Sequence, residues 1–137
     1  MPIQEYILYW LQSSYGLTFS LLHLYCSRGE GVLFLNTLTD YHEIESVLNK
    51  DIVMIVAKTH ACSTCAMINE HLRHTVHRLD EIEHYQVFID DMDAFRGKHV
   101  IFSVPTVLVF SQGKELLRES RFIDTHKVNR LIDAYLS

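Results

Sequence analysis

Residues 51–79 have the sequence DIVMIVAKTHACSTCAMINEHLRHTVHRL, in which an apolar run, two cysteines and an amphipathic segment follow one another. The apolar run at 52–57 predicts a buried β-strand. Further along, apolar residues recur at helical spacing and predict a helix that ends near residue 79. These residues are Ile68, Leu72, Val76 and Leu79. The motif Cys62-Ser63-Thr64-Cys65 therefore lies where a buried strand is followed by a helix.

The placement of Cys62 and Cys65 favours a redox-active dithiol. A thiolate at the N-terminus of a helix lies close to unpaired backbone N–H groups and to the positive end of the helix dipole, so its pKa falls. Two intervening residues let the second sulfur attack a mixed disulfide formed on the first. In an α/β setting this spacing is typical of thiol–disulfide exchange. The alternative is a pair of inert cysteines that act as small hydrophobic residues.

The composition narrows the class of protein. A chain of 137 residues can bury one core, and 48% hydrophobic with 21% charged residues is ordinary for a soluble domain. The net charge of −5 argues against nucleic acid as a partner, because a nucleic-acid binder needs a basic face. One close cysteine pair and a distant Cys26, which we interpret as an incidental thiol, predict a reducing, cytoplasmic location.

The N-terminal part differs from the rest of the chain. Residues 6–27 contain no Asp, Glu, Lys or Arg and are long enough for a membrane span of about 20 residues. Scattered polar residues argue against a span, and Glu5 in place of a positive charge argues against a signal peptide. We expect residues 1–31 to form an apolar helical extension to a domain at 32–137. Membrane contact is expected only through residues 6–27, if at all.

From residue 32 onward, predicted strands and helices alternate. The predicted strands are 32–35, 52–57, 85–90, 106–110 and 115–122, the last two joined by a hairpin turn at 111–114. A helix that carries Tyr41, Ile44, Val47 and Leu48 on one face is capped by Thr39 or Asp40. Another follows the cysteines, a short one is expected within 91–98, and Asp124 caps the last. The order is β-α-β-α-β-α-β-β-α.

Residues 32–137 resemble the thioredoxin family. Three features carry the resemblance: the element order, the Cys62–Cys65 motif after the second strand, and Pro105 at the start of the fourth. The resemblance implies an α/β protein with the thioredoxin fold, a mixed five-stranded sheet with helices on both faces. It also implies that Pro105 is preceded by a cis peptide bond and faces the dithiol.

The resemblance implies a thiol–disulfide oxidoreductase, with Cys62 as the exposed attacking sulfur and Cys65 as the buried resolving one. Cys65 also lies in line with the apolar stripe of the predicted helix. The partners would be a disulfide-containing protein and an external reductant, either a reductase or a low-molecular-weight thiol. No cofactor and no metal is expected. The expected substrate contacts are Val104, Pro105, His60, Ser63 and Thr64, with the backbone of Val104 able to pair with an extended chain.

Several positions depart from the family pattern. Val56 stands where thioredoxins bury an aspartate that helps to deprotonate the resolving sulfur, and Lys58 stands where a tryptophan is common. Arg121 replaces a glycine that usually opens the substrate groove near the last strand. The usual Trp-Cys-Gly-Pro-Cys becomes Ala-Cys-Ser-Thr-Cys. These departures favour a specialised protein, and they leave a redox-inactive binding or adaptor module as an alternative.

The histidines, nine in all, raise one more alternative. His60 would stabilise a thiolate when protonated, or it is a solvated loop residue. A metal site made of Cys62, Cys65 and His60 would need a fourth ligand that the sequence does not identify. His71, His74 and His77 recur at every third position, which predicts a polar, solvent-facing side of the helix.

Overall fold

The computed structural model describes residues 36–137. Several predictions fall outside these residues: the strand at 32–35, the extension at 1–31 with its domain boundary, membrane contact through 6–27, and the assignment of Cys26. Among the helices of the described part, none combines the length and the apolar character needed to cross a bilayer.

The described elements follow the predicted order. The strands are β1 (Asn36–Thr37), β2 (Val53–Lys58), β3 (Glu83–Phe88), β4 (Thr106–Ser111) and β5 (Lys114–Ser120). The helices are α3 (Tyr41–Leu48), α4 (Cys65–Thr75), α5 (Asp93–Lys98) and α6 (Thr125–Leu136). β1 lies just after the strand predicted at 32–35, and a short 3-10 helix, η1 (Leu79–Glu81), was not predicted from the sequence pattern.

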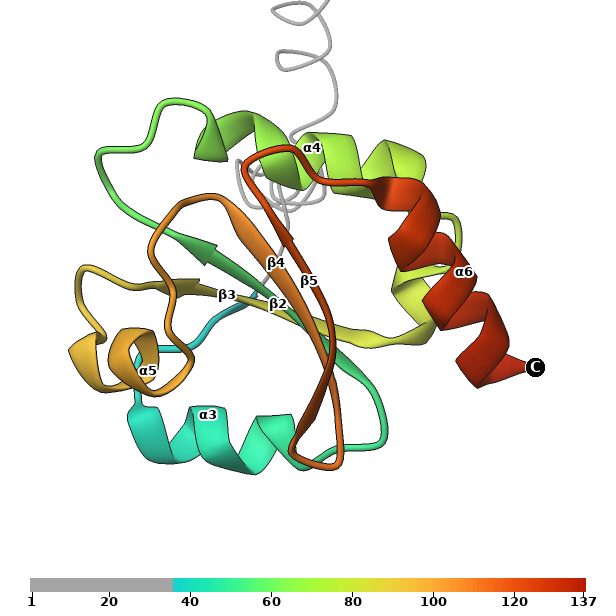
Figure 1. The fold of residues 1–137 in the computed structure, drawn as a ribbon, viewed down its shortest axis with the longest axis horizontal. Coiled ribbons are helices and arrows are strands. Elements are labelled where there is room, and N and C mark those ends of the chain that lie inside the picture. Colours follow the sequence, from blue (N-terminus) through green and yellow to red (C-terminus); the bar gives the residue numbers. More distant parts are fainter. Residues whose placement is uncertain (1–35) are drawn as a thin grey trace, which may run out of the picture. The chain divides into compact units, whose positions relative to one another are not determined.

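The strands form one mixed sheet in the order β1-β3-β2-β4-β5, with β2 at its centre (Figure 1). β3 runs parallel to β1 and β2, whereas β4 runs antiparallel to β2 and β5. This arrangement confirms the predicted five-stranded mixed sheet. Because β2 and β4 run in opposite directions, with Ala57 paired with Thr106, the loop after β2 lies next to the loop before β4.

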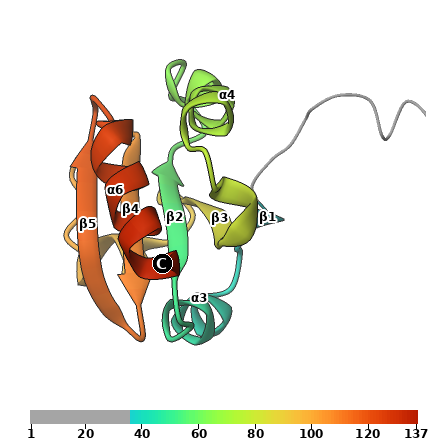
Figure 2. The ribbon, with the colours of Figure 1, turned by 90° about the vertical axis from the view of Figure 1, so that its right-hand side faces the viewer.

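Alternate residues of the central strands point to opposite faces of the sheet and build two apolar clusters. The first cluster is covered by α3 and α5, and the second by α4 and α6. Figure 2 shows β2 between α4 and α3. From β2, the first cluster receives Val53, Ile55 and Ala57, and the second receives Met54 and Val56. Helices therefore lie on both faces of the sheet, as predicted.

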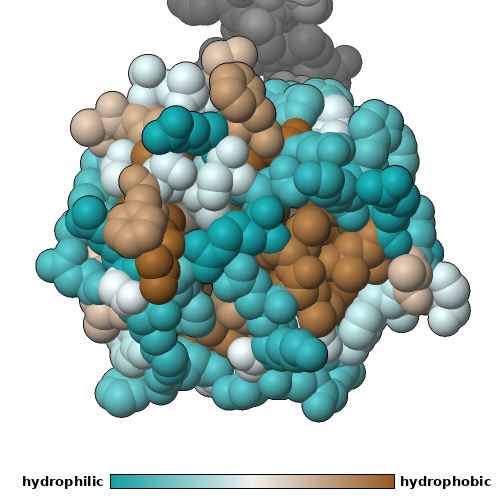
Figure 3. Space-filling model, in the orientation of Figure 1, coloured by the Kyte–Doolittle hydropathy of each residue, from teal (hydrophilic) through white to brown (hydrophobic). Residues whose placement is uncertain are grey.

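The second cluster approaches the surface beside the edge strand β5. Figure 3 shows apolar surface in the region between β5 and α6. The partly buried apolar residues that pack against this cluster are Leu79, Leu117, Ile123, Leu131 and Leu136. Part of the second core is therefore completed by residues from the last third of the chain.

The predicted helix caps and hairpin turn are confirmed. Asp40 and Asp124 cap α3 and α6, and each side chain accepts hydrogen bonds from backbone N–H groups of the first turn. Between β4 and β5, Gln112 and Gly113 both have positive φ, 49° and 82°, as a tight two-residue hairpin turn requires. A side chain on Gly113 would also meet Asn49 Oδ1 at 2.9 Å.

The predicted length of the helix after the cysteines is wrong. α4 ends at Thr75 rather than near Leu79, because Val76 is extended, with φ −95° and ψ 105°. Asn129 of α6 holds this end by donating to the Thr75 carbonyl (2.8 Å) and accepting from the His77 N–H (3.1 Å). Val76 is still buried in the second cluster. A residue at helical spacing is therefore buried here without being helical.

Candidate active site

The cysteines lie where β2 passes into α4. Cys62 is in the connecting loop, and Cys65 is the first residue of α4. The two form a disulfide, with their Cα atoms 5.3 Å apart. Cys65 is 2% exposed, whereas Cys62 is partly exposed. Cys62 is therefore the member of the pair that a second molecule can approach.

The first turn of α4 directs hydrogen-bond donors at the Cys62 sulfur. The Cys65 N–H donates to Cys62 Sγ (3.2 Å), and Thr64 Oγ1 lies 3.3 Å from the same sulfur. Thr64 is the N-cap residue, but its side chain makes no cap hydrogen bond and so is available to the sulfur. Ser63 is exposed in the same loop. After reduction, these donors and the helix dipole would stabilise a thiolate on Cys62.

Pro105 approaches this loop from the neighbouring strand. It is buried directly before β4, and its peptide bond with Val104 is cis. A groove of about 400 Å³ brings Pro105 together with Thr64. Much of its lining is apolar and open to solvent, since Met67 is 73% and Phe122 is 91% exposed. The remaining lining residues are Ile68 and His71 of α4, and Arg121 and Ile123 after β5.

Val104 directly precedes Pro105, one of the residues that line the groove. Its side chain is partly buried against the first cluster. Within residues 36–137, neither its N–H nor its C=O takes part in a backbone hydrogen bond, whereas the next carbonyl, of Pro105, accepts from the Arg121 N–H (2.9 Å). An extended segment of another chain could pair with the free backbone groups of Val104.

No family model matches the chain, but individual proteins and structures similar to it are thioredoxins or thioredoxin-like proteins. The thioredoxin-like protein YdfQ of Bacillus subtilis is 27% identical over 93 residues, 65% of this chain and 83% of that protein. Thioredoxin from Malassezia sympodialis matches with a TM-score of 0.64 and 19% identity, covering 80% of this chain and 99% of its own. Oxidised thioredoxin from Plasmodium falciparum matches with a TM-score of 0.63 and 18% identity, covering 76% of this chain and 100% of its own.

The chain has the thioredoxin fold. Its fold and its cysteine pair support thiol–disulfide oxidoreductase chemistry in general.

Within this fold, the chain carries an unusual pair of residues on the α4 side of β2. Val56, at the position of the family's buried aspartate, is fully buried in the second cluster. Lys58, two residues later and on the same side of the strand, is only 5% exposed, and its Nζ donates to Gln86 Oε1 (2.7 Å). Burial lowers the pKa of Lys58 to about 8. A titratable group therefore remains on this side of β2, although the carboxylate is missing.

Arg121 has a left-handed backbone, with φ 66°. Glycine adopts this conformation easily and other residues seldom do, which explains why a glycine is usual at this position of the family. Arg121 keeps the backbone geometry and its contact with Pro105, and it adds a long cationic side chain to the groove.

His60 hydrogen-bonds to acidic residues rather than to the cysteines. Its Nε2 lies 2.6 Å from Asp91 Oδ2, and its backbone N–H donates to Asp90 Oδ2 (3.1 Å). The hydrogen bond with Asp91 raises the pKa of His60. Within the described part of the chain, the group with metal-ligand spacing consists of these three exposed residues and includes neither cysteine. The structure therefore does not bring together the metal set of two cysteines and His60.

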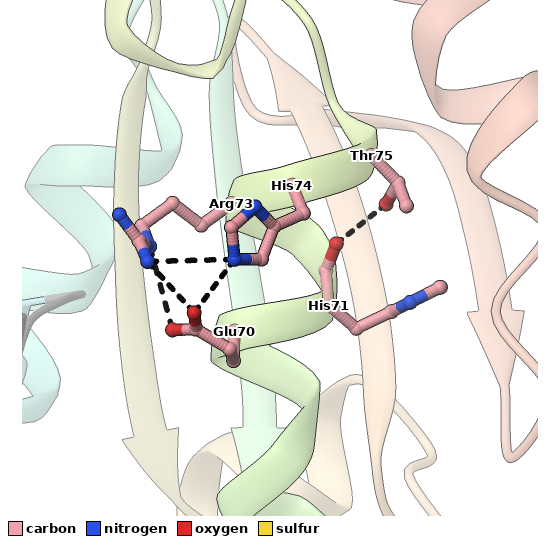
Figure 4. Close-up of polar contacts among 5 residues, drawn as sticks. All are labelled: Glu70, His71, Arg73, His74 and Thr75. Atoms are coloured by element: carbon pink, nitrogen blue, oxygen red, sulfur yellow. Dashed lines mark hydrogen bonds and ion pairs between the residues drawn. The ribbon is translucent and has the colours of Figure 1, made fainter.

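Two other histidines of this region, His71 and His74, lie on α4 (Figure 4). His74 Nε2 and an Arg73 amino group each lie 2.7 Å from Glu70 Oε1. The His71 side chain points away from this group, and it lines the groove. His77 follows the end of the helix. All three histidines are exposed, as predicted, but only His71 and His74 lie on the solvent-facing side of the helix.

The sequence pattern did not identify most residues of the groove. These residues are Met67, Ile68, His71, Phe122 and Ile123. Ile68 belongs to the buried stripe of α4, and the exposure of Met67 and Phe122 depends on how the loop after β5 meets α4. Their apolar character alone gave no signal, because most apolar residues are part of the core.

Proposed function

We propose that this protein is a thiol–disulfide oxidoreductase in which Cys62 is the nucleophile and Cys65 resolves the mixed disulfide. The observation that carries the proposal is the asymmetry of the pair. Cys62 is partly exposed and accepts the N–H of the first residue of α4, whereas Cys65 is buried within bonding distance of it. An exposed sulfur can meet a substrate, and a buried neighbour can reach only the first sulfur.

The proposed reaction has two exchange steps. The Cys62 thiolate attacks a substrate disulfide, forms a mixed disulfide and releases the first substrate sulfur as a thiolate. Cys65 then loses its proton and attacks Cys62 Sγ, which releases the second substrate thiolate. The substrate gains two electrons, and the protein is left with the Cys62–Cys65 disulfide. An external reductase or a low-molecular-weight thiol restores the dithiol, and the scheme uses no bound cofactor.

The groove supports a protein substrate bound as an extended segment. The free backbone groups of Val104 are suited to pair with such a segment, and the exposed side chains of Met67 and Phe122 offer apolar contacts near the dithiol. Pro105, Ser63 and Thr64 complete the proposed contact surface. His60 is not part of it, because its ring is bonded to Asp91. A reducing, cytoplasmic location is part of the same proposal.

Trapping with Cys65→Ser tests the function. With insulin as the disulfide substrate and dithiothreitol as the reductant, the wild-type chain should accelerate insulin reduction, and Cys62→Ser should not. Mixed with insulin after removal of dithiothreitol, reduced Cys65→Ser should remain joined to insulin as a mixed disulfide that added reductant releases. Cys26→Ser is the matched control and should behave as wild type. A wild-type chain that neither reduces insulin nor forms an adduct through Cys62 would refute the proposal.

A binding or adaptor module with an inactive dithiol is the second candidate. The observation that favours it is the apolar Val56 at the position where the family has a buried carboxylate. For this function, Cys62→Ser would leave partner binding intact, and no mixed disulfide would be captured by Cys65→Ser.

A further inference from the structure

Lys58 is the one charged side chain among the buried residues of the described chain. It ends β2 and lies on the face of the sheet that α4 covers, four positions before Cys62. A lysine at the end of a strand normally extends its amine into water, because burying a cation without a counter-ion is costly. The amine of Lys58 is instead held inside the protein.

The surroundings of this amine are polar but uncharged. Within residues 36–137, the hydrogen-bond partner of Lys58 Nζ is Gln86 Oε1 (2.7 Å), although an ammonium group has three N–H donors. Gln86 Oε1 also accepts from Asn69 Nδ2 (3.3 Å), and Gln86 Nε2 donates to Thr37 Oγ1 (2.7 Å). Asn69 Oδ1 is buried without a hydrogen-bond partner. The amine can therefore lose its proton at a pH near neutral, which agrees with a Lys58 pKa of about 8.

Asn69 connects this polar group to the dithiol. It lies four residues after Cys65 on α4, and residues at this spacing lie one above the other on the same side of a helix. The Asn69 amide meets Gln86 Oε1, the same atom that accepts from Lys58. The amine of Lys58 therefore lies near Asn69, in the second turn of α4, about one helical turn (~5.4 Å along the axis) beyond Cys65.

We propose that Lys58 is the acid–base group that exchanges a proton with Cys65 in the resolving step. This inference depends on the proposed function. In the mixed disulfide, the neutral Lys58 amine accepts the proton of the Cys65 thiol and becomes an ammonium group. The Cys65 thiolate attacks Cys62 Sγ, the new disulfide forms, and the substrate thiolate leaves. Lys58 then returns its proton to solvent. The charge that forms on Cys65 is balanced by the ammonium in a buried site.

No other titratable side chain of the described residues meets the amine. Gln86 of β3, Asn69 of α4 and Thr37 of β1 are neutral at all relevant pH values. His60 and Asp91 are exposed in the loops beyond the strand ends and are bonded to each other. In the proposed step, Lys58 therefore shares its proton with reduced Cys65 and with no other titratable side chain of the described residues.

The test follows the two steps separately in the full chain with Cys26→Ser. The reduced protein is mixed with dithiobis(nitrobenzoate) in a stopped-flow instrument. Attack by Cys62 releases one coloured thiolate, and resolution by Cys65 releases a second. Lys58→Met should leave the first phase unchanged and slow the second about tenfold near pH 8, since loss of a neighbouring cation raises a thiol pKa by about one unit or more. Lys114→Met, which removes an exposed lysine from the start of β5, is the matched control.

Lys58→Arg separates charge from proton transfer. Arginine keeps the cation but does not deprotonate, so the second phase should lose its inflection near the Lys58 pKa of about 8. A full wild-type pH profile in Lys58→Arg would overturn the role as a proton acceptor. A normal second phase in Lys58→Met would overturn the inference while leaving the proposed function intact. Absence of the first phase in the unsubstituted chain would instead refute the function itself.

A measurement that needs no turnover guards against misfolding of the variants. With Cys62 and Cys26 both replaced by serine, Cys65 is the remaining thiol, and its titration is followed by the ultraviolet absorbance of the thiolate. Lys58→Met should raise the Cys65 pKa by about one unit, while the circular dichroism spectrum stays unchanged. An unchanged Cys65 pKa in a folded variant would contradict the inference.

Discussion

The two faces of the sheet are built by the same alternating strands, yet they differ at one end. The buried cluster under α3 and α5 is apolar, with Ile44 and Phe95 fully buried, and the partly buried ring of His99 packs against Phe95 and Phe110. The face under α4 and α6 is equally apolar around Ile132, but at the end of β2 it contains the buried amine of Lys58. An amine without a counter-ion reduces stability where apolar packing would increase it. The fully buried side chains of one face are therefore apolar, whereas the other face combines apolar packing with a buried amine on the side of the dithiol.

The largest expected effect comes from removing a buried side chain from the apolar cluster under α3 and α5. Phe95→Ala should lower the free energy of unfolding by about 3–5 kcal/mol, because the side chain is fully buried and a cavity would remain. Urea titration of the oxidised protein measures this loss. Phe95 lies on α5 and does not line the groove, so the exchange rate of the folded fraction should be unchanged.

The exposed neighbour Arg96 provides the control for this prediction. Arg96→Ala should change the free energy of unfolding by no more than about 0.5 kcal/mol. A folded Phe95→Ala protein with a much slower exchange rate would show that the two faces do not act separately.

The second effect has the opposite sign. Lys58→Met should stabilise the protein at pH 7 by about 2 kcal/mol, because a buried cation is replaced by an apolar side chain of similar length. The folded pKa of about 8 lies below the ordinary value of 10.5. Between these values the unfolded chain binds more protons, so the stability of the unsubstituted protein should rise with pH across this window.

This rise should be absent in Lys58→Met and present in Lys114→Met. Unfolding by urea at the two ends of the window, in oxidised chains with Cys26→Ser, measures it without thiol exchange. A Lys58→Met protein that is less stable than the control at pH 7 would show that the amine contributes to stability.

The sequence predicted the features that depend on local pattern. The buried run before Cys62, the cap at Asp124 and the turn at Gly113 all follow from periodicity and from residues with special backbone preferences. The early end of α4 could not be predicted, because it depends on Asn129, which is distant in the sequence. The burial of Lys58 was equally hidden, since its partners come from β3 and α4 and a lysine at a strand end is ordinarily solvated.

The third prediction concerns the groove on the α4 side. Phe122→Ala should raise the KM for a peptide disulfide with an apolar residue beside the cysteine about fivefold, which corresponds to about 1 kcal/mol. Phe122 is 91% exposed, so stability should hardly change. Phe102→Ala removes a phenylalanine that is 86% exposed and outside the groove, and it should leave the KM unchanged. Equal effects of the two substitutions would indicate non-specific adhesion to exposed aromatic rings.

The smallest expected effect is on the pKa of His60, in the loop between β2 and α4. His60 is exposed and bonded to Asp91, which raises its pKa above the ordinary 6.5. Asp91→Asn should lower the His60 pKa toward that value, and nuclear magnetic resonance titration of the imidazole protons measures the change. The sign follows from linkage: a raised folded pKa stabilises the protein at low pH, and this contribution disappears as the pH rises through it.

The same substitution decides whether His60 influences the dithiol. The pKa of Cys62 in the reduced protein, measured from the pH dependence of its alkylation, should not respond to Asp91→Asn, because the imidazole is exposed and salt screens its charge. Asp93→Asn, at the exposed start of α5, is the matched control for the loss of one carboxylate. A shift of the Cys62 pKa in Asp91→Asn but not in Asp93→Asn would place His60 within the electrostatic environment of the thiolate. The polar side of the sheet would then include the loop as well as the buried amine.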